Sequence, residues 1–284
     1  MGRPDALFPP SGDYPGMHAV TLGPAGTYSH RAAKSVAGEV SFRESVASIV
    51  EAVAAGQFDR GVIAIENSID GSVTESLDAL VDHEIAVVRE VVTPVRHALI
   101  ADSEEFEMVA SHSKALAQCR EFLAAEYPEA RLEAVASTAR GVERAREDVS
   151  IAAIAHPDTA HDGLQALAED IQDTDSNATR FFVVAPITER SEAGGKSTVI
   201  VYPGTDYPGL LLELLKAFAD RDINLSRIES RPSGARLGDY LFHVDFEAGL
   251  YEERTKAALE DVEGIVAADG WVRRLGSYDV EHVV

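Results

Sequence analysis

The chain has 284 residues, of which 45% are hydrophobic, and a formal net charge of −23 at pH 7 from 48 acidic and 25 basic residues. This charge is spread along the whole chain, so it opposes binding to nucleic acid or to an anionic membrane, and no apolar run approaches the roughly 20 residues that cross a bilayer. The single cysteine, Cys119, excludes a disulfide framework and a cysteine-based metal site. A lone thiol and an acidic surface indicate a reducing compartment with high salt, and we expect a cytoplasmic, halophilic protein.

The first two thirds of the chain alternate short apolar strands with helical patterns, which is typical of an α/β fold. Residues 1–17, which precede the first predicted strand, are expected to form a disordered extension. Strands are expected at 18–23, 39–45, 60–67, 85–101, 108–111, 131–137, 150–155, 170–172 and 179–185. Helices are expected at 29–36, 46–56, 73–82, 113–126, 138–147 and 156–167.

A change of composition marks a second unit near the C-terminus. Residues 187–196 are rich in Gly and charged side chains and predict a linker. The pattern beyond it predicts a ferredoxin-like β-α-β-β-α-β domain at 197–278. Its elements are expected at 198–202, 208–220, 223–230, 239–246, 251–262 and 265–275.

Several common kinds of active site lack their sequence motifs. No G-x-G-x-x-G follows the first predicted strand, and neither a G-x-x-x-x-G-K-[ST] loop nor a G-x-S-x-G turn is present. The nine histidines show no metal-binding spacing such as H-E-x-x-H, and we expect His97, His156 and His161 to lie at the surface or at helix ends. The sequence therefore predicts no metal and no organic cofactor.

Polar clusters stand instead at the junctions between predicted strands and helices. They are GPAGTYSH (23–30), ENSIDGSV (66–73), SHSKALAQC (111–119), ASTARG (136–141) and NATRF (177–181). Any one of them is explained by helix capping, because Ser, Thr and Asn satisfy the first free N–H groups of a helix. Helix N-termini also favour anions, so the five clusters together predict a pocket for a small anion.

These clusters, in this order and with IESRP at 228–232, resemble the prephenate dehydratase family from residue 18 to about residue 278. The resemblance implies a catalytic region at 18–186 with two α/β lobes, similar to type II periplasmic binding proteins. One lobe would comprise 18–95 with 176–186 and the other 96–175, followed by an ACT regulatory domain. It also implies an enzyme that converts prephenate to phenylpyruvate, with loss of carbon dioxide and water, in phenylalanine biosynthesis and without a cofactor. Because only 17 residues stand before the first predicted strand, we expect the enzyme to be monofunctional.

The resemblance implies roles for individual residues. Thr179 matches the residue most associated with catalysis, Glu66 and Asn67 match the ENS motif beside it, and Arg180 matches a carboxylate anchor. Either Thr179 or Glu66 is expected to handle the proton of the leaving hydroxyl. The other residues expected to contact substrate are Phe181, Ser68, Thr27, Ser111, Gln118, Ser137 and Thr138.

The C-terminal domain is expected to bind L-phenylalanine as an effector at a subunit interface of a homodimer or homotetramer. The residues that match the family's effector motifs are Gly209, Leu211, Asn224, Leu225, Glu229, Ser230, Arg231 and Pro232. Leu210 stands where the family usually has a small residue, so we expect it to crowd the ligand.

Two other functions remain open at this stage. Arogenate dehydratases share these motifs and differ in accepting an amino group in place of the keto group. A non-catalytic amino-acid-sensing protein would also use a two-lobed cleft with an ACT domain, although the intact Thr-Arg-Phe triplet favours catalysis.

Overall fold

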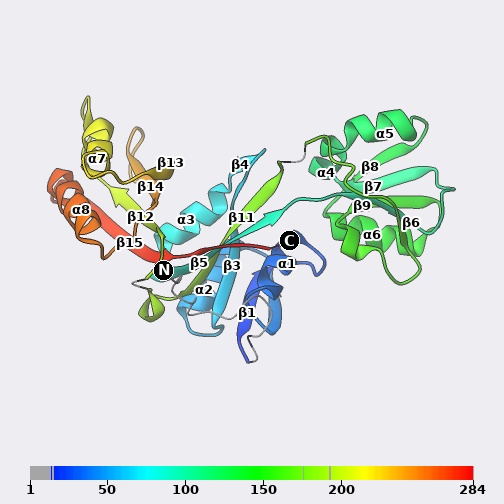
Figure 1. The fold of residues 1–284 in the computed structure, drawn as a ribbon, viewed down its shortest axis with the longest axis horizontal. Coiled ribbons are helices and arrows are strands. Elements are labelled where there is room, and N and C mark those ends of the chain that lie inside the picture. The colour runs from blue at the N-terminus through cyan, green and yellow to red at the C-terminus, as the bar shows by residue number, and fades with distance from the viewer. Residues whose placement is uncertain (1–13, 15, 175, 192, 284) are drawn as a thin grey trace, which may run out of the picture.

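The computed structural model describes residues 14, 16–174, 176–191 and 193–283. Most of the predicted extension at 1–17 lies outside these residues. Three β-sheets lie in a row along the long axis of the molecule, each with its own helices (Figure 1). We call them the first lobe, the second lobe and the C-terminal unit. Within the described residues no helix is long and apolar enough to span a membrane.

The first lobe is built on a seven-stranded sheet in the order β16-β5-β11-β3-β1-β2, with β4 paired to β3. Strands β1, β2 and β3 run parallel, whereas β11 enters antiparallel between β3 and β5. The strands are β1 (His18–Leu22), β2 (Glu39–Arg43), β3 (Arg60–Asn67), β4 (Gly71–Ser72), β5 (Ile85–Pro94), β11 (Ala178–Pro186) and β16 (Val280–His282), and the helices are α1 (Tyr28–Lys34), α2 (Val46–Ala54) and α3 (Thr74–Asp82).

The second lobe has a five-stranded sheet in the order β10-β6-β9-β7-β8. Its strands are β6 (Ala98–Ala101), β7 (Met108–His112), β8 (Arg131–Val135), β9 (Ile151–Ala155) and β10 (Gln165–Ala168). Its helices are α4 (Ser113–Gln118), α5 (Arg120–Glu126) and α6 (Thr138–Glu147), with a 3-10 turn at Pro157–Thr159.

The longest predicted strand, 85–101, is wrong as a single element. It is divided into β5 in the first lobe and β6 in the second, so residues 95–97 cross between the lobes. Pro94 ends β5, because proline has no N–H to continue a ladder. Because the apolar pattern continues through both strands, the sequence did not indicate where the chain crosses from one lobe to the other.

Three further expectations in the second lobe need correction. The helix predicted at 156–167 is limited to the 3-10 turn, and Gln165–Ala168 forms β10 instead. Asp162 and Gly163 have positive φ angles (56° and 92°), so a right-handed helix cannot continue through them. Residues 170–172 form no strand, and the helix predicted at 113–126 is interrupted at Cys119.

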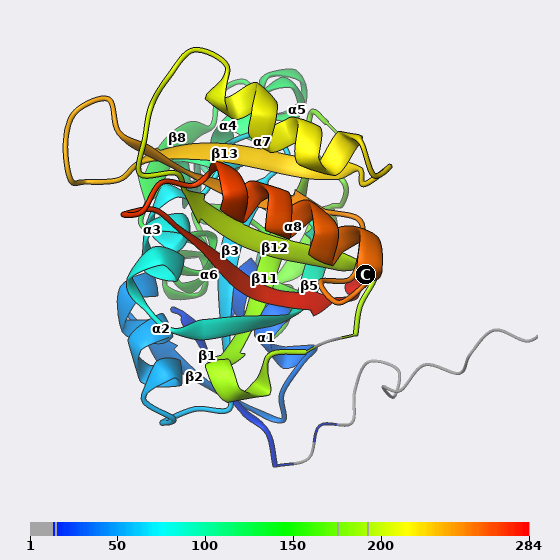
Figure 2. The same ribbon diagram turned by 90° about the vertical axis from the view of Figure 1, so that its left-hand side faces the viewer.

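The C-terminal unit confirms the predicted β-α-β-β-α-β order. It consists of β12 (Lys196–Tyr202), α7 (Leu210–Ala219), β13 (Leu225–Pro232), β14 (Tyr240–Phe246), α8 (Glu253–Ile265) and β15 (Trp271–Tyr278). The sheet order is β13-β14-β12-β15, and α7 and α8 cover one face (Figure 2). The other face packs on the first lobe.

The C-terminal unit and the first lobe share one hydrophobic core. Ile200, Leu275 and Tyr278 belong to the same buried cluster as Val87 and Phe182 of the first lobe. After β15 the chain adds β16 alongside β5, a strand that the sequence pattern did not predict. The contact is close enough to require glycine at 276, where a Cβ atom would lie 2.2 Å from the carbonyl oxygen of Val87 and φ is +152°.

We therefore expect Gly276→Ala to lower the free energy of unfolding by about 1–3 kcal/mol, because backbone must move to admit the methyl group. Gly264→Ala is the matched control, since Gly264 lies in α8 with nothing within 4 Å of an added Cβ. The control should gain up to about 1 kcal/mol from helix propensity. Urea titration measures both, and equal stabilities of the two variants would contradict the close approach of β15 to β5.

Candidate functional site

The predicted polar junctions of the two lobes meet around one cavity. It encloses about 960 Å³, including space open to solvent. The first lobe lines it with residues that include Thr27, Tyr28, Asn67, Asp70, Thr179 and Phe181. The second lobe contributes His112, Lys114, Gln118, Ser137 and Thr138.

A chain of hydrogen bonds crosses this cavity from one lobe to the other. The Asn67 side-chain amide donates to Thr179 Oγ1 at 3.0 Å and to Asn177 Oδ1 at 2.9 Å. Asn177 Nδ2 donates to Gln118 Oε1 at 3.0 Å, and His97 Nε2 lies 2.9 Å from the same oxygen. Because Thr179 Oγ1 accepts from Asn67, its hydroxyl hydrogen is left to donate elsewhere.

Local structure holds Asn67 at the end of β3. Its Oδ1 accepts from the backbone N–H groups of Ile69 and Asp70, at 3.0 and 3.1 Å, which fixes the turn after the strand. Ser68 ties this turn to the segment before β11, since its Oγ donates to the Ser176 carbonyl and accepts from Ala178 N, both at 3.0 Å. Ser68 does not line the cavity, so its predicted role as a substrate contact is replaced by this structural one.

Sequence reasoning missed His97 as part of the site, and it placed Asn177 in the NATRF cluster without assigning it a role. Both side chains are buried, with 2% exposure each. Burial lowers the pKa of His97 and outweighs the opposing effect of its bond to Gln118, so the neutral ring donates to the Gln118 oxygen. His97 was expected at the surface or at a helix end, and the signal that would have placed it is its position in the crossing between β5 and β6.

Three predicted substrate contacts have local roles as well. Thr27 caps α1 and Ser137 caps α6 through their side-chain oxygens, and both line the cavity together with Thr138. Ser111 is fully buried and donates to the carbonyl of Ile154 at 2.6 Å. It does not line the cavity, so the structure does not support it as a substrate contact.

Arg180 is turned away from the cavity, which corrects its predicted role as a substrate carboxylate anchor. Successive residues of a strand point to opposite faces, so Thr179 and Phe181 face the cavity while Arg180 faces the C-terminal unit. Its guanidinium lies 2.7 Å from Asp245, 3.0 Å from Glu90 and 3.3 Å from Glu66. Glu66 is likewise a partner of Arg180 rather than a residue that lines the cavity.

Arg180 belongs to a cluster of three cations and three carboxylates at the boundary between the first lobe and the C-terminal unit. The other cations are Lys196, 2.8 Å from Glu90, and Arg227, 3.5 Å from Asp245. Asp245 is completely buried. Burial alone would raise its pKa, but Arg180 and Arg227 hold the pKa of Asp245 below its usual value. We call this set the ionic cluster.

The predicted effector residues lie on two faces of β13. Glu229 and Arg231 point to the first lobe, where Glu229 accepts from Ser72 Oγ at 2.8 Å and Arg231 pairs with both oxygens of Asp78 at 3.1 and 3.0 Å. Ser230 and Pro232 are exposed on the strand, and Leu225 begins it. Asn224, just before the strand, donates to Glu247 at 3.0 Å.

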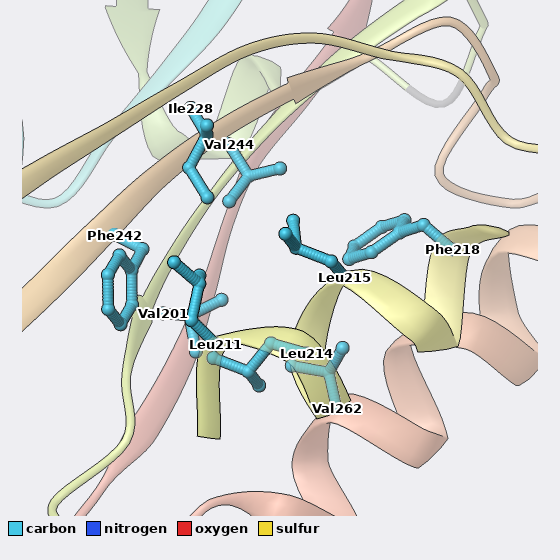
Figure 3. Close-up of a pocket in the computed structure, with 9 residues that line it drawn as sticks. All are labelled: Val201, Leu211, Leu214, Leu215, Phe218, Ile228, Phe242, Val244 and Val262. Atoms are coloured by element: carbon cyan, nitrogen blue, oxygen red, sulfur yellow. The ribbon is translucent and has the colours of Figure 1, made fainter. Parts of the chain in front are cut away.

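An apolar pocket of about 260 Å³, including space open to solvent, lies between α7 and the sheet of the C-terminal unit. Leu211 and Ile228 meet there with residues of β12, β14 and α8 (Figure 3). Leu210 packs into the core of the unit and does not line this pocket. Gly209 precedes α7 with φ at 101°, a conformation that favours glycine.

The position of Arg180 predicts a large cost for removing its charge. Arg180→Met would leave the buried carboxylate of Asp245 without its nearest cation and that of Glu90 with Lys196 alone, so we expect the free energy of unfolding to fall by about 3–5 kcal/mol. Arg140→Met, which removes an exposed arginine paired with Glu143, is the control and should change stability little. Chemical denaturation compares them, and a stable Arg180→Met protein with a raised KM would restore Arg180 as a substrate anchor.

Comparison with known proteins agrees with this architecture. A family model described as prephenate dehydratase matches residues 19–188, and one described as ACT domain matches residues 204–264. The prephenate dehydratase of Methanocaldococcus jannaschii is 35% identical over 270 residues, which cover 90% of this chain and 96% of the relative. An Arabidopsis thaliana protein named arogenate dehydratase/prephenate dehydratase 2, chloroplastic, is 39% identical over 249 residues, which cover 81% of this chain and 64% of the relative.

A solved structure is similar over nearly the same span. It is the crystal structure of prephenate dehydratase from Arthrobacter aurescens in complex with L-Phe, with 36% sequence identity and a TM-score of 0.84, covering 93% of this chain and 90% of that one. The order of the two lobes and the C-terminal unit, the cavity at the polar junctions and these matches together show that the chain belongs to the prephenate dehydratase family and carries a C-terminal ACT domain.

Proposed function

We propose that this chain catalyses the decarboxylating dehydration of prephenate to phenylpyruvate and that phenylalanine regulates it. The observation that carries the catalytic part is the Thr179 hydroxyl, which faces the cavity with its oxygen fixed by Asn67 at 3.0 Å and its hydrogen left to donate. Family membership and the relatives named above support the choice of substrate.

The leaving hydroxyl needs a hydrogen-bond donor at the moment its carbon–oxygen bond breaks. Thr179 supplies that donor, and the amide of Asn67 supports the threonine oxygen as charge develops. Such preorganised donors are worth a few kcal/mol of transition-state stabilisation. Between Thr179 and Glu66, the geometry favours Thr179 because Glu66 is bound to Arg180 outside the cavity.

The second half of the reaction is the loss of a carboxylate as neutral carbon dioxide. The cavity wall includes the apolar side chains of Leu22, Val95, Ala115 and Phe181. An apolar surrounding disfavours a charged carboxylate more than a neutral product. The wall therefore assists the step that removes charge, and ring aromatisation supplies its driving force.

Turnover of prephenate by purified protein in concentrated KCl tests the proposal, with phenylpyruvate formation as the readout. We expect Thr179→Val to lower kcat about 10²–10³-fold with folding intact. Thr93→Val is the matched control, because Thr93 is the register partner of Thr179 on β5 and its hydroxyl is buried without a partner. Near-normal turnover in the Thr179 variant would remove it from the mechanism.

Arogenate is the second candidate substrate, favoured by the Arabidopsis relative, whose name includes both activities. Parallel assays with prephenate and arogenate decide between them by kcat/KM. A folded protein that turns over neither would instead support an amino-acid-sensing role. We also propose that the protein requires salt, because salt screens the repulsion among the acidic side chains that give the net charge of −23. The proposed setting is a cytoplasm with high salt.

For the regulatory part, we propose that phenylalanine binds beside the apolar pocket at the β13 edge of the ACT sheet. The support is the exposed apolar surface there, where Ile228 and Leu211 are 40% and 41% exposed, and the L-Phe complex of the Arthrobacter relative. A second copy of the chain would cover this edge strand, which fits a homodimer or a homotetramer.

Arg231 connects this edge to the catalytic lobe through Asp78. We expect Arg231→Ala to raise the phenylalanine concentration for half-inhibition about fivefold or more while basal turnover is retained, since coupling between sites is typically 1–3 kcal/mol. Arg236→Ala, in the exposed loop after β13, is the control. Inhibition curves measure the shift, and an unchanged curve for Arg231→Ala would exclude this connection.

A further inference from the structure

Two residues that line the cavity form an ion pair between the two lobes. Lys114 Nζ, from the start of α4 in the second lobe, lies 2.9 Å from Asp70 Oδ2 in the turn after β3 of the first lobe. The Lys114 and Asp70 side chains are 58% and 35% exposed. Among the described residues that line the cavity, Lys114 is the only lysine or arginine and Asp70 the only acid.

This pair is easy to exchange. An ion pair between exposed side chains contributes only about 0–1 kcal/mol, so an incoming carboxylate replaces Asp70 at Lys114 with little loss. The need for a local cation is large here, because a chain with a net charge of −23 repels anions as they approach. Arg180 does not meet that need, since its guanidinium is turned to Asp245 and Glu90.

We propose that Lys114 binds the carboxylate of the 2-oxo acid side chain of the substrate and displaces Asp70 from the pair. This inference rests on the proposed function. Asp70 is tied to the site through its backbone N–H, which donates to Asn67 Oδ1 at 3.1 Å. The exchange at Lys114 therefore takes place beside the turn that positions Asn67.

The chemistry decides which of the two substrate carboxylates takes this place. The ring carboxylate leaves as neutral carbon dioxide, so a cation bound to it would stabilise the substrate more than the transition state and slow the reaction. The side-chain carboxylate keeps its charge from substrate through transition state to phenylpyruvate. A lysine on that group binds all three about equally, which affects KM and leaves kcat unchanged.

The test compares Lys114→Gln with the parent protein on prephenate in concentrated KCl. A lost charge-assisted hydrogen bond is worth about 1.4 kcal/mol or more, so we expect KM to rise about tenfold with kcat unchanged. The inhibition constant of phenylpyruvate should rise by the same factor. Asp70→Asn removes the same ion pair and keeps the ammonium group, so it should not raise KM, and Lys216→Gln, a distant exposed lysine of α7, should change nothing.

Three results would overturn the assignment. An unchanged KM in Lys114→Gln would mean that Lys114 does not bind substrate. A higher kcat with unchanged phenylpyruvate inhibition would place Lys114 on the ring carboxylate, and an equal rise of KM in Asp70→Asn would reduce the pair to a link between the lobes. If the parent turns over no prephenate, the proposed function fails, and calorimetry with phenylpyruvate then tests Lys114 by itself: weaker binding to Lys114→Gln supports it, and equal or absent binding to both proteins refutes it.

Discussion

The ionic cluster around Arg180 is the constraint on which the arrangement of the site depends. Burying the carboxylates of Glu90 and Asp245 is unfavourable unless cations meet them at short range, and Arg180, Lys196 and Arg227 do so where the ACT sheet packs on the first lobe. Arg180 lies on β11, so its anchored side chain fixes which face of that strand is turned to the ACT domain. Alternation along the strand then turns Thr179 and Phe181 to the cavity.

This placement joins regulation to catalysis over a very short distance along the chain. The residue that faces the ACT domain and the residue that faces substrate are neighbours on β11. A second connection runs through β13, where Glu229 binds Ser72 on β4 and β4 pairs with β3 beside Glu66 and Asn67. A shift of the ACT sheet therefore acts directly on β11 and β3, the two strands that carry Thr179 and Asn67, without a long series of residues between the two sites.

The sequence predicted the ACT domain well because its elements are separate and amphipathic, with clear strand and helix periods. It predicted poorly where one apolar pattern serves two sheets, as in β5 and β6, and where a turn-rich segment adds an edge strand, as in β10. For the site, Thr179, Asn67, Gln118 and Thr27 were predicted to be in contact with substrate, and the structure brings them to one cavity. Arg180 and Glu66 were predicted with them because they match the family's motifs, but each is adjacent to a cavity residue in a strand, and adjacent side chains of a strand lie on opposite faces.

Both lobes contribute to the site. Asn67 and Thr179 belong to the first lobe and Gln118 to the second, and the hydrogen bonds through Asn177 join them across the crossing segments. The ACT domain contacts the first lobe through its shared core, through Glu229 and Arg231, and through the ionic cluster. An effect of the ACT domain on the second lobe therefore passes through the two segments that join the lobes, after β5 and before β11. His97 lies on one of these crossings and Asn177 on the other, and both are buried members of the same hydrogen-bond chain. Gln118 is the member of this chain that belongs to the second lobe, so its bonds to Asn177 and His97 are the ones that depend on where the second lobe lies, whereas Thr179 is held on its own strand by Asn67.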